Sequence, residues 1–233
     1  MRNNLFTDAG ISLESGKIQD FEEYRTLILE YNKIMDITNI TDEEDMYIKH
    51  FIDSLYLDKS GLISSANSLI DIGTGGGFPG IPLKILYPHL ELTLLDSLNK
   101  RVNFLTDVIG RMKLDKTKAI HGRAEELARN SSYREMYDLA TSRAVAPLNT
   151  LIEYSLAFVK IGGYFVAMKG PNYDDELSEA RDAINTMGGK LKKVVNYSLP
   201  YGYGDRSIII IEKIKSTPKK YPRGQGKPRK QPL

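Results

Sequence analysis

From residue 69 onward, short apolar runs alternate with stretches of helical periodicity, and no other feature restricts the fold of this 233-residue chain as strongly. Strands that alternate with helices form a mostly parallel sheet covered on both faces, so the pattern predicts an α/β fold. The predicted strands are Leu69–Ile72, Leu92–Leu95, Thr117–Ile120, Tyr137–Thr141, Gly163–Met168, Leu191–Tyr197 and Ser207–Glu212. The predicted helices between them are Ile81–Leu86, Asn99–Met112, Arg123–Arg129, Leu148–Val159 and Asp174–Met187. Because only a turn separates the last two strands, we expect them to form an antiparallel hairpin at one edge of the sheet.

The segment before this pattern is helical. Apolar residues recur every three or four positions from Ile18 to Met35, which predicts one helix. Thr41 and Glu44 have the spacing of a capping box and predict a second helix that runs to about Leu57. We therefore expect a helical extension packed on the main domain, an α/β domain and a C-terminal tail, at residues 1–60, 61–214 and 215–233 respectively.

The tail is basic and rich in proline. Eight of the 32 lysines and arginines lie from Lys213 onward, where there is no acidic residue, which leaves 24 basic against 30 acidic residues in the rest of the chain. The tail has too little apolar surface to order by itself, although Tyr221–Arg223 and Gln231–Leu233 are able to dock as extended segments. The charge distribution predicts a polyanionic partner, and the alternative is a solvated, disordered terminus.

Two absences exclude whole classes of site. The chain has no cysteine, which excludes disulfides, iron–sulfur clusters, thiolate metal sites and a cysteine nucleophile. Its histidines, His50, His89 and His121, are scattered, so we expect no metal. No apolar run is long enough to span a membrane, and the first residues lack the apolar core of a signal peptide. We expect a cytoplasmic protein that has no membrane partner.

The strongest local motif is a glycine-rich turn between a buried strand and a helix, Leu69 to Gly80. Such a turn lets a ligand approach the backbone at the ligand-binding edge of an α/β sheet. Gly75, Gly77 and Gly80 formally fit a dinucleotide fingerprint, but Pro79 has no N–H to offer a pyrophosphate. In the alternative register Asp71 precedes Gly73 and Gly75, and an acid there suits a ligand with an ammonium and a sulfonium group. This pattern resembles motif one of S-adenosylmethionine-dependent methyltransferases.

Two further positions belong to the same edge. Asp96 ends the next strand, 21 residues after Gly75, where a carboxylate accepts both ribose hydroxyls. The dinucleotide hypothesis and the S-adenosylmethionine hypothesis both use this carboxylate. The alternative is that Asp96 only caps the loop. Ala124 and Glu125 follow the third strand at the expected rim of an adenine site, although Glu125 also suits the first turn of a helix.

The loop after the fourth strand, residues 141–148, faces the acceptor in this architecture. It lacks the Asn/Asp-Pro-Pro-Tyr/Phe sequence of many amino-methylating enzymes, and without cysteine no covalent attack on a pyrimidine is available. An acceptor that is already nucleophilic remains, such as guanine N7, which has an in-plane lone pair and no proton to lose. We therefore expect positioning of the acceptor and no acid–base catalytic residue. Arg143 is the nearest candidate, either for the cofactor carboxylate or for an RNA phosphate, and a surface salt bridge is the alternative.

Basic residues near this edge and in the tail predict a track for an RNA backbone. They are Lys100, Arg101, Lys169, Lys219, Lys220, Arg223 and Lys230. Each of them alone is more often a solvated surface charge. We expect truncation after Ile214 to weaken RNA binding and to leave cofactor binding intact.

The chain resembles the GidB-type methyltransferases over nearly its full length. Tyr31-Asn32 through Ile40 is similar to the family's "YN…xxLTxI" stretch, and residues 50–55 to its "HxxDSL" stretch. The sequence Asp-Ile-Gly-Thr-Gly-Gly-Gly-Phe-Pro-Gly from Asp71 and the closing Tyr-Pro-Arg-x-x-Gly-x-Pro-x-Lys-x-Pro-Leu are the most specific matches. Segments beginning at Asp96, His121 and Ser142 also align.

This resemblance implies a class I S-adenosylmethionine-dependent methyltransferase with a Rossmann-like sheet and an N-terminal helical addition. It implies direct in-line transfer to N7 of one guanine in the decoding region of 16S ribosomal RNA, with the RNA or the small ribosomal subunit as partner and a monomeric enzyme favoured. It places the cofactor against Gly73, Phe78, Ala124, Glu125 and Arg143. His50 and Asp53 match a family stretch without an assigned function, and we expect a structural pair.

Two other hypotheses remain open from the residues. A nucleotide-dependent oxidoreductase would bind NADH and not S-adenosylhomocysteine. An RNA-binding module that has lost catalysis would bind RNA and show no affinity for the cofactor.

Overall fold

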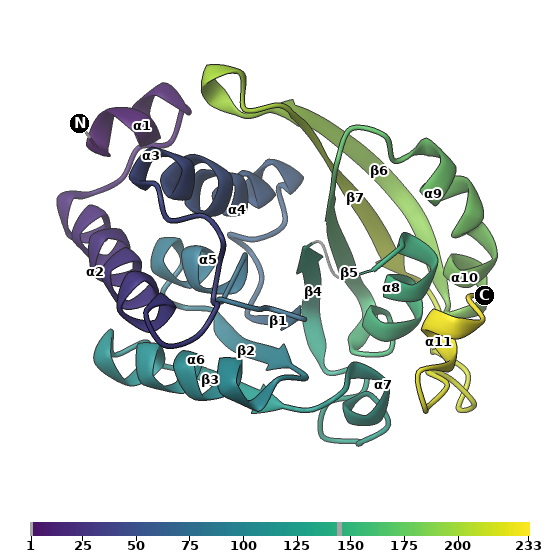
Figure 1. The fold of residues 1–233 in the computed structure, drawn as a ribbon. Coiled ribbons are helices and arrows are strands. Elements are labelled where there is room, and N and C mark those ends of the chain that lie inside the picture. The colour runs from purple at the N-terminus through teal and green to yellow at the C-terminus, as the bar shows by residue number, and fades with distance from the viewer. Residues whose placement is uncertain (1, 144–145) are drawn as a thin grey trace.

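The computed structural model describes residues 2–143 and 146–233. Its centre is a seven-stranded sheet with the order β3-β2-β1-β4-β5-β7-β6 (Figure 1). The strands are β1 (Ser68–Ile72), β2 (Glu91–Asp96), β3 (Thr117–His121), β4 (Tyr137–Arg143), β5 (Val159–Lys169), β6 (Gly189–Ser198) and β7 (Asp205–Lys213). The first five strands pair in parallel, whereas β7 is antiparallel to both β5 and β6. The predicted α/β fold with an antiparallel hairpin at one edge is confirmed.

The two faces of the sheet are both apolar. Successive side chains of a strand point to opposite faces. In β1, Leu69 packs into one core cluster while Ile70 and Ile72 pack into the other. One face is covered by α5 (Gly80–Leu86) and α6 (Asn99–Arg111). The helices on the other side are α7 (Ala124–Leu127), α8 (Leu148–Ser155), α9 (Asp174–Glu179) and α10 (Arg181–Thr186).

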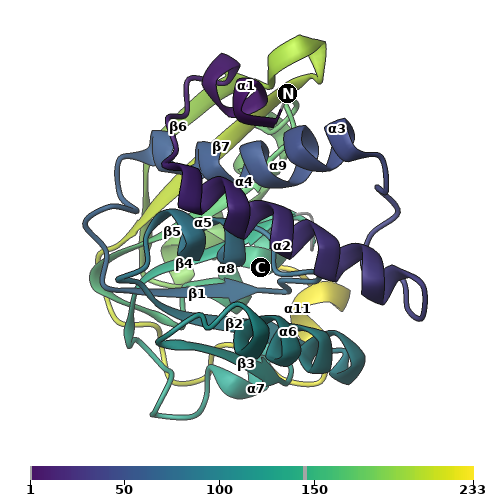
Figure 2. The ribbon, with the colours of Figure 1, turned by 90° about the vertical axis from the view of Figure 1, so that its left-hand side faces the viewer.

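The first sixty residues form helices that add to the first of these faces. They are α1 (Arg2–Asp8), α2 (Ser15–Asn32), α3 (Glu43–Met46), the π-helical turn η1 (Tyr47–Ile52), α4 (Asp53–Leu55) and the 3-10 turn η2 (Tyr56–Ser60). Helix α2 lies across α5 and α6 (Figure 2). Buried aromatic residues of these helices, among them Phe21 and Phe51, share one core cluster with Leu92 and Leu94 of β2. The extension is therefore part of the main hydrophobic core.

Several local expectations need correction. Helix α1 has no counterpart among the predicted elements. The cap of the second predicted helix is Asp42, whose carboxylate accepts the N–H of Asp45 at 2.9 Å, in place of Thr41. The helix predicted from Asp174 to Met187 divides at Ala180 into α9 and α10. Within the described residues no helix is both long and apolar enough to cross a membrane.

The C-terminal segment is docked on the body of the protein. It ends in the short helix α11 (Lys227–Lys230), which packs against α8 (Figure 1). Tyr221 and Pro228 are buried, and Leu233 packs against the same core cluster as α8. The tail that cannot order by itself therefore orders on the domain.

Candidate functional site

The glycine-rich turn after β1 is held in shape by the protein itself. Gly73, Gly75 and Gly77 have φ values of 68°, 59° and 98°, the left-handed region that side chains disfavour. The N–H groups of Gly73 and Thr74 donate to the carbonyl of Leu95 at 2.8 and 3.1 Å, which ties the turn to the end of β2. The Tyr24 hydroxyl on α2 donates to the carbonyl of Gly76 from the other side.

This turn does not offer a phosphate cradle. A pyrophosphate site needs N–H groups that point outward at the start of the helix. Here the N–H groups that bond inside the protein are those of Gly73, Thr74, Gly75, Gly77, Phe78 and Gly80. Pro79 has no N–H, and the first N–H of α5, on Gly80, donates to Asp71 at 2.9 Å. The structure therefore disfavours the dinucleotide hypothesis.

Asp71 shapes the turn from beneath. Its side chain is fully buried, and one oxygen accepts the Thr74 hydroxyl at 2.7 Å as well as the Gly80 N–H. Burial raises the pKa of this carboxyl to about 6, against the two hydrogen bonds, which lower it. Asp71 lines neither of the cavities described below, because it shares with Leu69 the strand face that packs under α5. This corrects the expectation of a direct contact between Asp71 and the cofactor.

Two adjoining cavities lie at the carboxyl edge of the parallel strands. Their volumes are about 660 and 920 Å³, and both are lined by Gly73, Asp96, Ser97 and Arg229. We call the first the nucleoside cavity, because Ala124 and Glu125 line it as expected for an adenine rim. We call the second the acceptor cavity. It gathers Gly75, Phe78, Arg101 and Arg143 with His50 and Asp53 of the helical extension.

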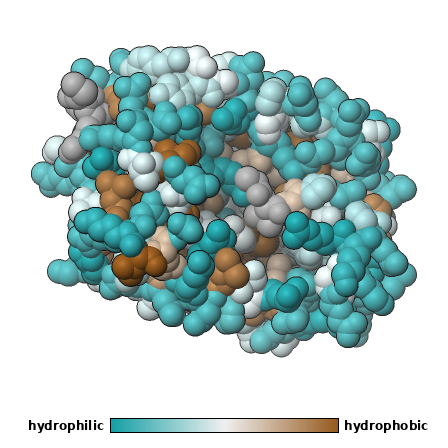
Figure 3. Space-filling model, viewed as in Figure 1, coloured by the Kyte–Doolittle hydropathy of each residue, from teal (hydrophilic) through white to brown (hydrophobic). Residues whose placement is uncertain are grey.

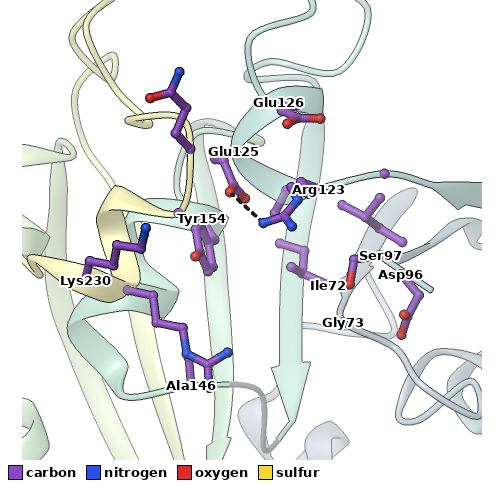
Figure 4. A pocket seen from close by; sticks show the side chains of 16 residues that line it. Ile72, Gly73, Asp96, Ser97, Arg123, Glu125, Glu126, Ala146, Tyr154 and Lys230 are labelled. Carbon is purple, nitrogen blue, oxygen red and sulfur yellow. Dashed lines mark ion pairs between the residues drawn. The ribbon is translucent and has the colours of Figure 1, made fainter.

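Asp96 is the acidic side chain that the nucleoside cavity shares with the acceptor cavity. Asp96 is almost fully buried at the end of β2, and its two oxygens each accept one N–H at 2.9 Å, from Gly75 and from Leu98. The oxygen that accepts from Gly75 also accepts from Arg101 at 3.5 Å. Of about four acceptor sites on the carboxylate, one is therefore free and one is held only by this long contact. Figure 4 shows Asp96 and Ser97 on one side of this cavity and Tyr154 and Lys230 on the opposite side.

In the acceptor cavity two nitrogen-rich side chains that contact each other, His50 and Arg143, both lie against the ring of Phe78. The imidazole of His50 stacks on Phe78 with ring centroids 4.4 Å apart, and the guanidinium carbon of Arg143 lies 5.1 Å from the same ring. Arg143 donates to Asp53 at 3.0 Å and to the carbonyl of Lys49 at 3.2 Å. Tyr197 on β6 donates its hydroxyl to the other oxygen of Asp53 at 2.8 Å. Residues of the helical extension therefore hold Arg143 in place, and Tyr197 holds Asp53.

His50 is neutral in this setting. Burial and the neighbouring Arg143 lower the pKa of its ring to about 3. Because a guanidinium only donates, Nδ1 accepts from Arg143 at 3.3 Å and Nε2 carries the proton toward the Thr38 hydroxyl, 2.7 Å away. Asn32 holds Thr38 in turn, accepting its N–H at 3.2 Å and donating to its carbonyl at 2.9 Å. The two N-terminal family stretches thus meet in one network, and His50 itself lies in the π-helical turn η1.

The neutrality of His50 predicts an acid-sensitive stability. The folded state does not protonate His50 until pH 3, whereas the unfolded chain does so below pH 6.5. The free energy of unfolding therefore falls as the pH drops below 6.5, by about 1.4 kcal/mol per pH unit or about 2 kcal/mol at pH 5. In urea unfolding from pH 7.5 to 5, the free energy of unfolding should fall by this amount more in the wild type than in His50→Gln. The opposite contribution of Asp71, whose raised pKa favours the folded state on acidification, is common to both. A difference in the free energy of unfolding between the two proteins that does not change with pH would contradict the prediction.

The basic residues predicted for an RNA backbone fall into two groups. Lys100, Lys219, Lys220 and Lys230 are exposed, and Arg101 lines the acceptor cavity. Lys169 and Arg223 also have partners inside the protein, although Lys169 lines the acceptor cavity as well. The ammonium of Lys169 lies 2.6 Å from Glu176, and Arg223 binds the buried Glu153. In the predicted acceptor loop, Ala144 and Val145 lie outside the described residues.

Other residues of the site were not predicted from the sequence. They are Tyr154, Tyr197, Arg206, Gln225 and Arg229. The side of the sheet on which Arg143 finds its partner could have been predicted. Arg143 lies four positions after Leu139 in the same strand, so both side chains point to the same face, and Leu139 faces the N-terminal helices. His50 and Asp53 are three positions apart on a helical stretch and therefore share a face. No pattern in the sequence identifies Tyr197, which lies on the edge strand β6.

The face of the molecule seen in Figure 3 is largely hydrophilic. Lys49, Arg101, Arg206 and Arg229 line the acceptor cavity together with Arg143. The acidic residues that line it each have a cationic partner within 3.5 Å: Asp96 with Arg101, Asp53 with Arg143, and Glu176 with Lys169. The mouth of this cavity is therefore suited to an anionic polymer.

Comparisons with known proteins agree with this geometry. The Bacillus cereus O-methyltransferase in complex with SAH has a TM-score of 0.60 at 14% identity and covers 90% of this chain and 96% of its own, which shows a shared fold. The ribosomal RNA small subunit methyltransferase G of Lachnoclostridium phytofermentans is 50% identical over 224 residues, 96% of this chain and 93% of the relative. Its counterpart in Alkaliphilus metalliredigens is 46% identical over 226 residues, 97% of this chain and 95% of the relative. The GidB family model, described as rRNA small subunit methyltransferase G, matches residues 17–208, and the chain therefore belongs to this family.

Proposed function

We propose that this chain transfers the methyl group of S-adenosylmethionine to N7 of a guanine in 16S ribosomal RNA. The observation that carries the proposal is the pair of cavities that meet at Gly73 and Asp96, one built for a nucleoside and the other bordered by cations. The membership of the family supports the RNA acceptor. In this reading the helices of residues 1–60 supply one wall of the acceptor cavity through Ile40, Lys49, His50 and Asp53, and residues 61–214 form the catalytic domain.

The residues present fit S-adenosylmethionine, which supplies an electrophilic methyl group on a sulfonium centre. Asp96 is placed to accept the ribose hydroxyls, and Ala124 and Glu125 border the base. The carboxylate of Asp71 lies beneath the turn without touching the cavity and contributes negative charge near the cationic end. Arg143 and Phe78 stand at the passage toward the acceptor.

The acceptor cavity positions its ligand and moves no proton. Guanine N7 attacks through its lone pair, so no base is required. Both nitrogens of neutral His50 are hydrogen-bonded, and Asp53 is occupied by Arg143 and Tyr197. Alignment of acceptor and methyl group supplies the rate enhancement, and positioning of this kind lowers barriers by about 7–11 kcal/mol.

In this proposal the RNA is bound through its charge. Lys49, Arg101, Arg206 and Arg229 border the acceptor cavity, and Lys100, Lys219 and Lys220 are exposed elsewhere on the surface. We propose the 16S RNA or the small ribosomal subunit as the partner, a monomeric enzyme and a cytoplasmic location. Affinity for RNA should then fall steeply as salt is added, since bound phosphates release counterions.

The test is transfer of a labelled methyl group to three acceptors: transcribed 16S RNA, particles assembled from it and bulk protein. We expect label at one guanine, located as N7-methylguanine by base-specific chain scission, and none with Asp96→Asn. The exposed Asp115→Asn is the matched control and should retain activity. Cofactor binding without RNA label would move the function to another methyl acceptor. RNA binding without cofactor binding would instead support a binding module, and binding of NADH alone an oxidoreductase.

A further inference from the structure

The C-terminal residues 217–233, which we call the C-terminal strap, are fixed to the domain by an ion pair. Glu153 on α8 has no exposed surface, and its carboxylate accepts from Arg223 at 2.7 Å (Nη2) and 3.0 Å (Nε). The same carboxylate accepts the backbone N–H of Arg223 at 2.7 Å. Arg223 also donates to the carbonyl of Gln231 at 2.8 Å, so this one side chain holds both ends of the loop that carries α11. A buried carboxylate with this many partners fixes the strap in a single place.

Two arginines that follow α7 hold the strap from the other side. Arg129 donates twice to the carbonyl of Pro222, at 2.9 and 3.1 Å. Arg134 donates to the carbonyls of Thr217 and Tyr221, at 2.7 and 2.9 Å. Side-chain donors that bind backbone carbonyls recognise the path of the chain and do not depend on its charged side chains. These contacts add to the Arg223–Glu153 ion pair and use no other charged side chain of the strap.

The anchors stand directly beside the nucleoside cavity. Glu153 is the neighbour of Tyr154, which lines this cavity, and Arg129 follows the helix whose Ala124 and Glu125 form another wall. Between the anchors the strap contributes four lining residues, Gln225, Gly226, Arg229 and Lys230. Figure 4 shows Lys230 beside Tyr154, on the side of the cavity away from Asp96.

We propose that the C-terminal strap is a wall of the cofactor site, with Arg229 and Lys230 as adenosine-binding residues and the Arg223–Glu153 ion pair as the group that holds the wall closed. The inference rests on the proposed function, because it takes the nucleoside cavity as the adenosine site. Adenosine is uncharged, so two cations beside it incur no repulsion, and both a guanidinium and an ammonium bind favourably against aromatic rings. Truncation after Ile214 should therefore weaken cofactor binding, contrary to the expectation from the sequence.

The first test compares two pairs of substitutions in the same segment. Arg229→Gln with Lys230→Gln removes two charges at the cavity, and Lys219→Gln with Lys220→Gln removes two charges outside it. Direct binding is measured without RNA for S-adenosylhomocysteine and for methylthioadenosine, which lacks the amino-acid end. We expect the cavity pair to raise Kd about ten-fold for both ligands and the outer pair to change it less than about two-fold.

The equal loss for both ligands distinguishes a wall at the adenosine from a contact with the amino-acid end. A loss confined to S-adenosylhomocysteine would overturn the assignment to adenosine. Unchanged Kd values in the cavity pair, with a wild-type chain that binds both ligands, would overturn the inference alone. A wild-type chain that binds neither ligand would overturn the proposed function as well.

The second test opens the strap without leaving a buried charge unpaired. The double variant Glu153→Gln with Arg223→Gln replaces the ion pair by two neutral amides of similar size. We expect trypsin to cleave within residues 215–230 several-fold faster than in the wild type, while the Kd for methylthioadenosine rises about ten-fold. In the wild type, saturating methylthioadenosine should slow this cleavage. Faster cleavage with an unchanged Kd would show that the strap is held by the ion pair but is not a wall of the site.

Discussion

Asp96→Asn should weaken the binding of S-adenosylmethionine by at least about 100-fold, because hydrogen bonds to a charged group contribute about 1.5–3 kcal/mol each and two ribose hydroxyls depend on this carboxylate. The carboxylate also accepts the N–H groups of Gly75 and Leu98. An amide has only one acceptor oxygen, so one of these donors loses its partner and the glycine turn moves away from β2. Titration calorimetry with S-adenosylmethionine and with methylthioadenosine measures the loss.

A matched control separates the ribose contact from the stability of the turn. Asp71→Asn keeps an oxygen that accepts from Thr74 and Gly80, and Asp71 lines neither cavity. It should bind methylthioadenosine within a few-fold of the wild type. Relative to the wild type, Asp71→Asn should lose more affinity for S-adenosylmethionine than for S-adenosylhomocysteine. The reason is that the substitution removes negative charge near the sulfonium. Equal losses of methylthioadenosine affinity in Asp96→Asn and Asp71→Asn would contradict the assignment of the ribose to Asp96.

Most of the fold can be predicted from the local alternation of strands and helices. The βα units from β1 to β5 and the final hairpin follow from patterns within some ten residues, and the positions of Gly73, Asp96 and Ala124 at one edge follow from the rule that carboxyl ends of parallel strands share an edge. It is harder to predict whether the side chain of such a residue points into a cavity or under a helix. Asp71 and Asp96 both precede loops, yet only Asp96 lines a cavity, because α5 closes over Asp71.

Long-range pairs limited the prediction of the site. The carboxylate of Asp53 meets Arg143, 90 positions later, and Tyr197, 144 positions later. A single sequence contains no periodicity that links such residues. The same holds for Arg223, whose charge predicts a solvated side chain until the fold places the buried Glu153 beside it. Basic residues are therefore ambiguous in a sequence: Lys219 stays exposed, whereas Arg223 is used inside the structure.

Arg143→Met should reduce methyl transfer by at least about 100-fold and lower the free energy of unfolding by about 3 kcal/mol, because removal of one partner leaves the other charge buried. Asp53 is 5% exposed and would retain only the hydroxyl of Tyr197. The double variant Asp53→Asn with Arg143→Met removes both charges and should recover most of the stability. Transfer should stay low in the double variant, since the group beside Phe78 is still missing.

The exposed ion pair between Arg111 and Glu30 supplies the control for these effects. Its two side chains are each 46% exposed, so Arg111→Met should cost less than about 1 kcal/mol and leave transfer unchanged. Urea unfolding at pH 7.5 and transfer kinetics with saturating RNA measure both quantities for all variants. If the double variant recovered transfer along with stability, Arg143 would serve only to neutralise Asp53. If Arg143→Met cost no more stability than Arg111→Met, the network of Asp53, Arg143 and Tyr197 would not hold the acceptor cavity in shape. Recovery of stability without transfer separates the two functions of Arg143, as the partner of a buried carboxylate and as a cationic side chain that lines the acceptor cavity.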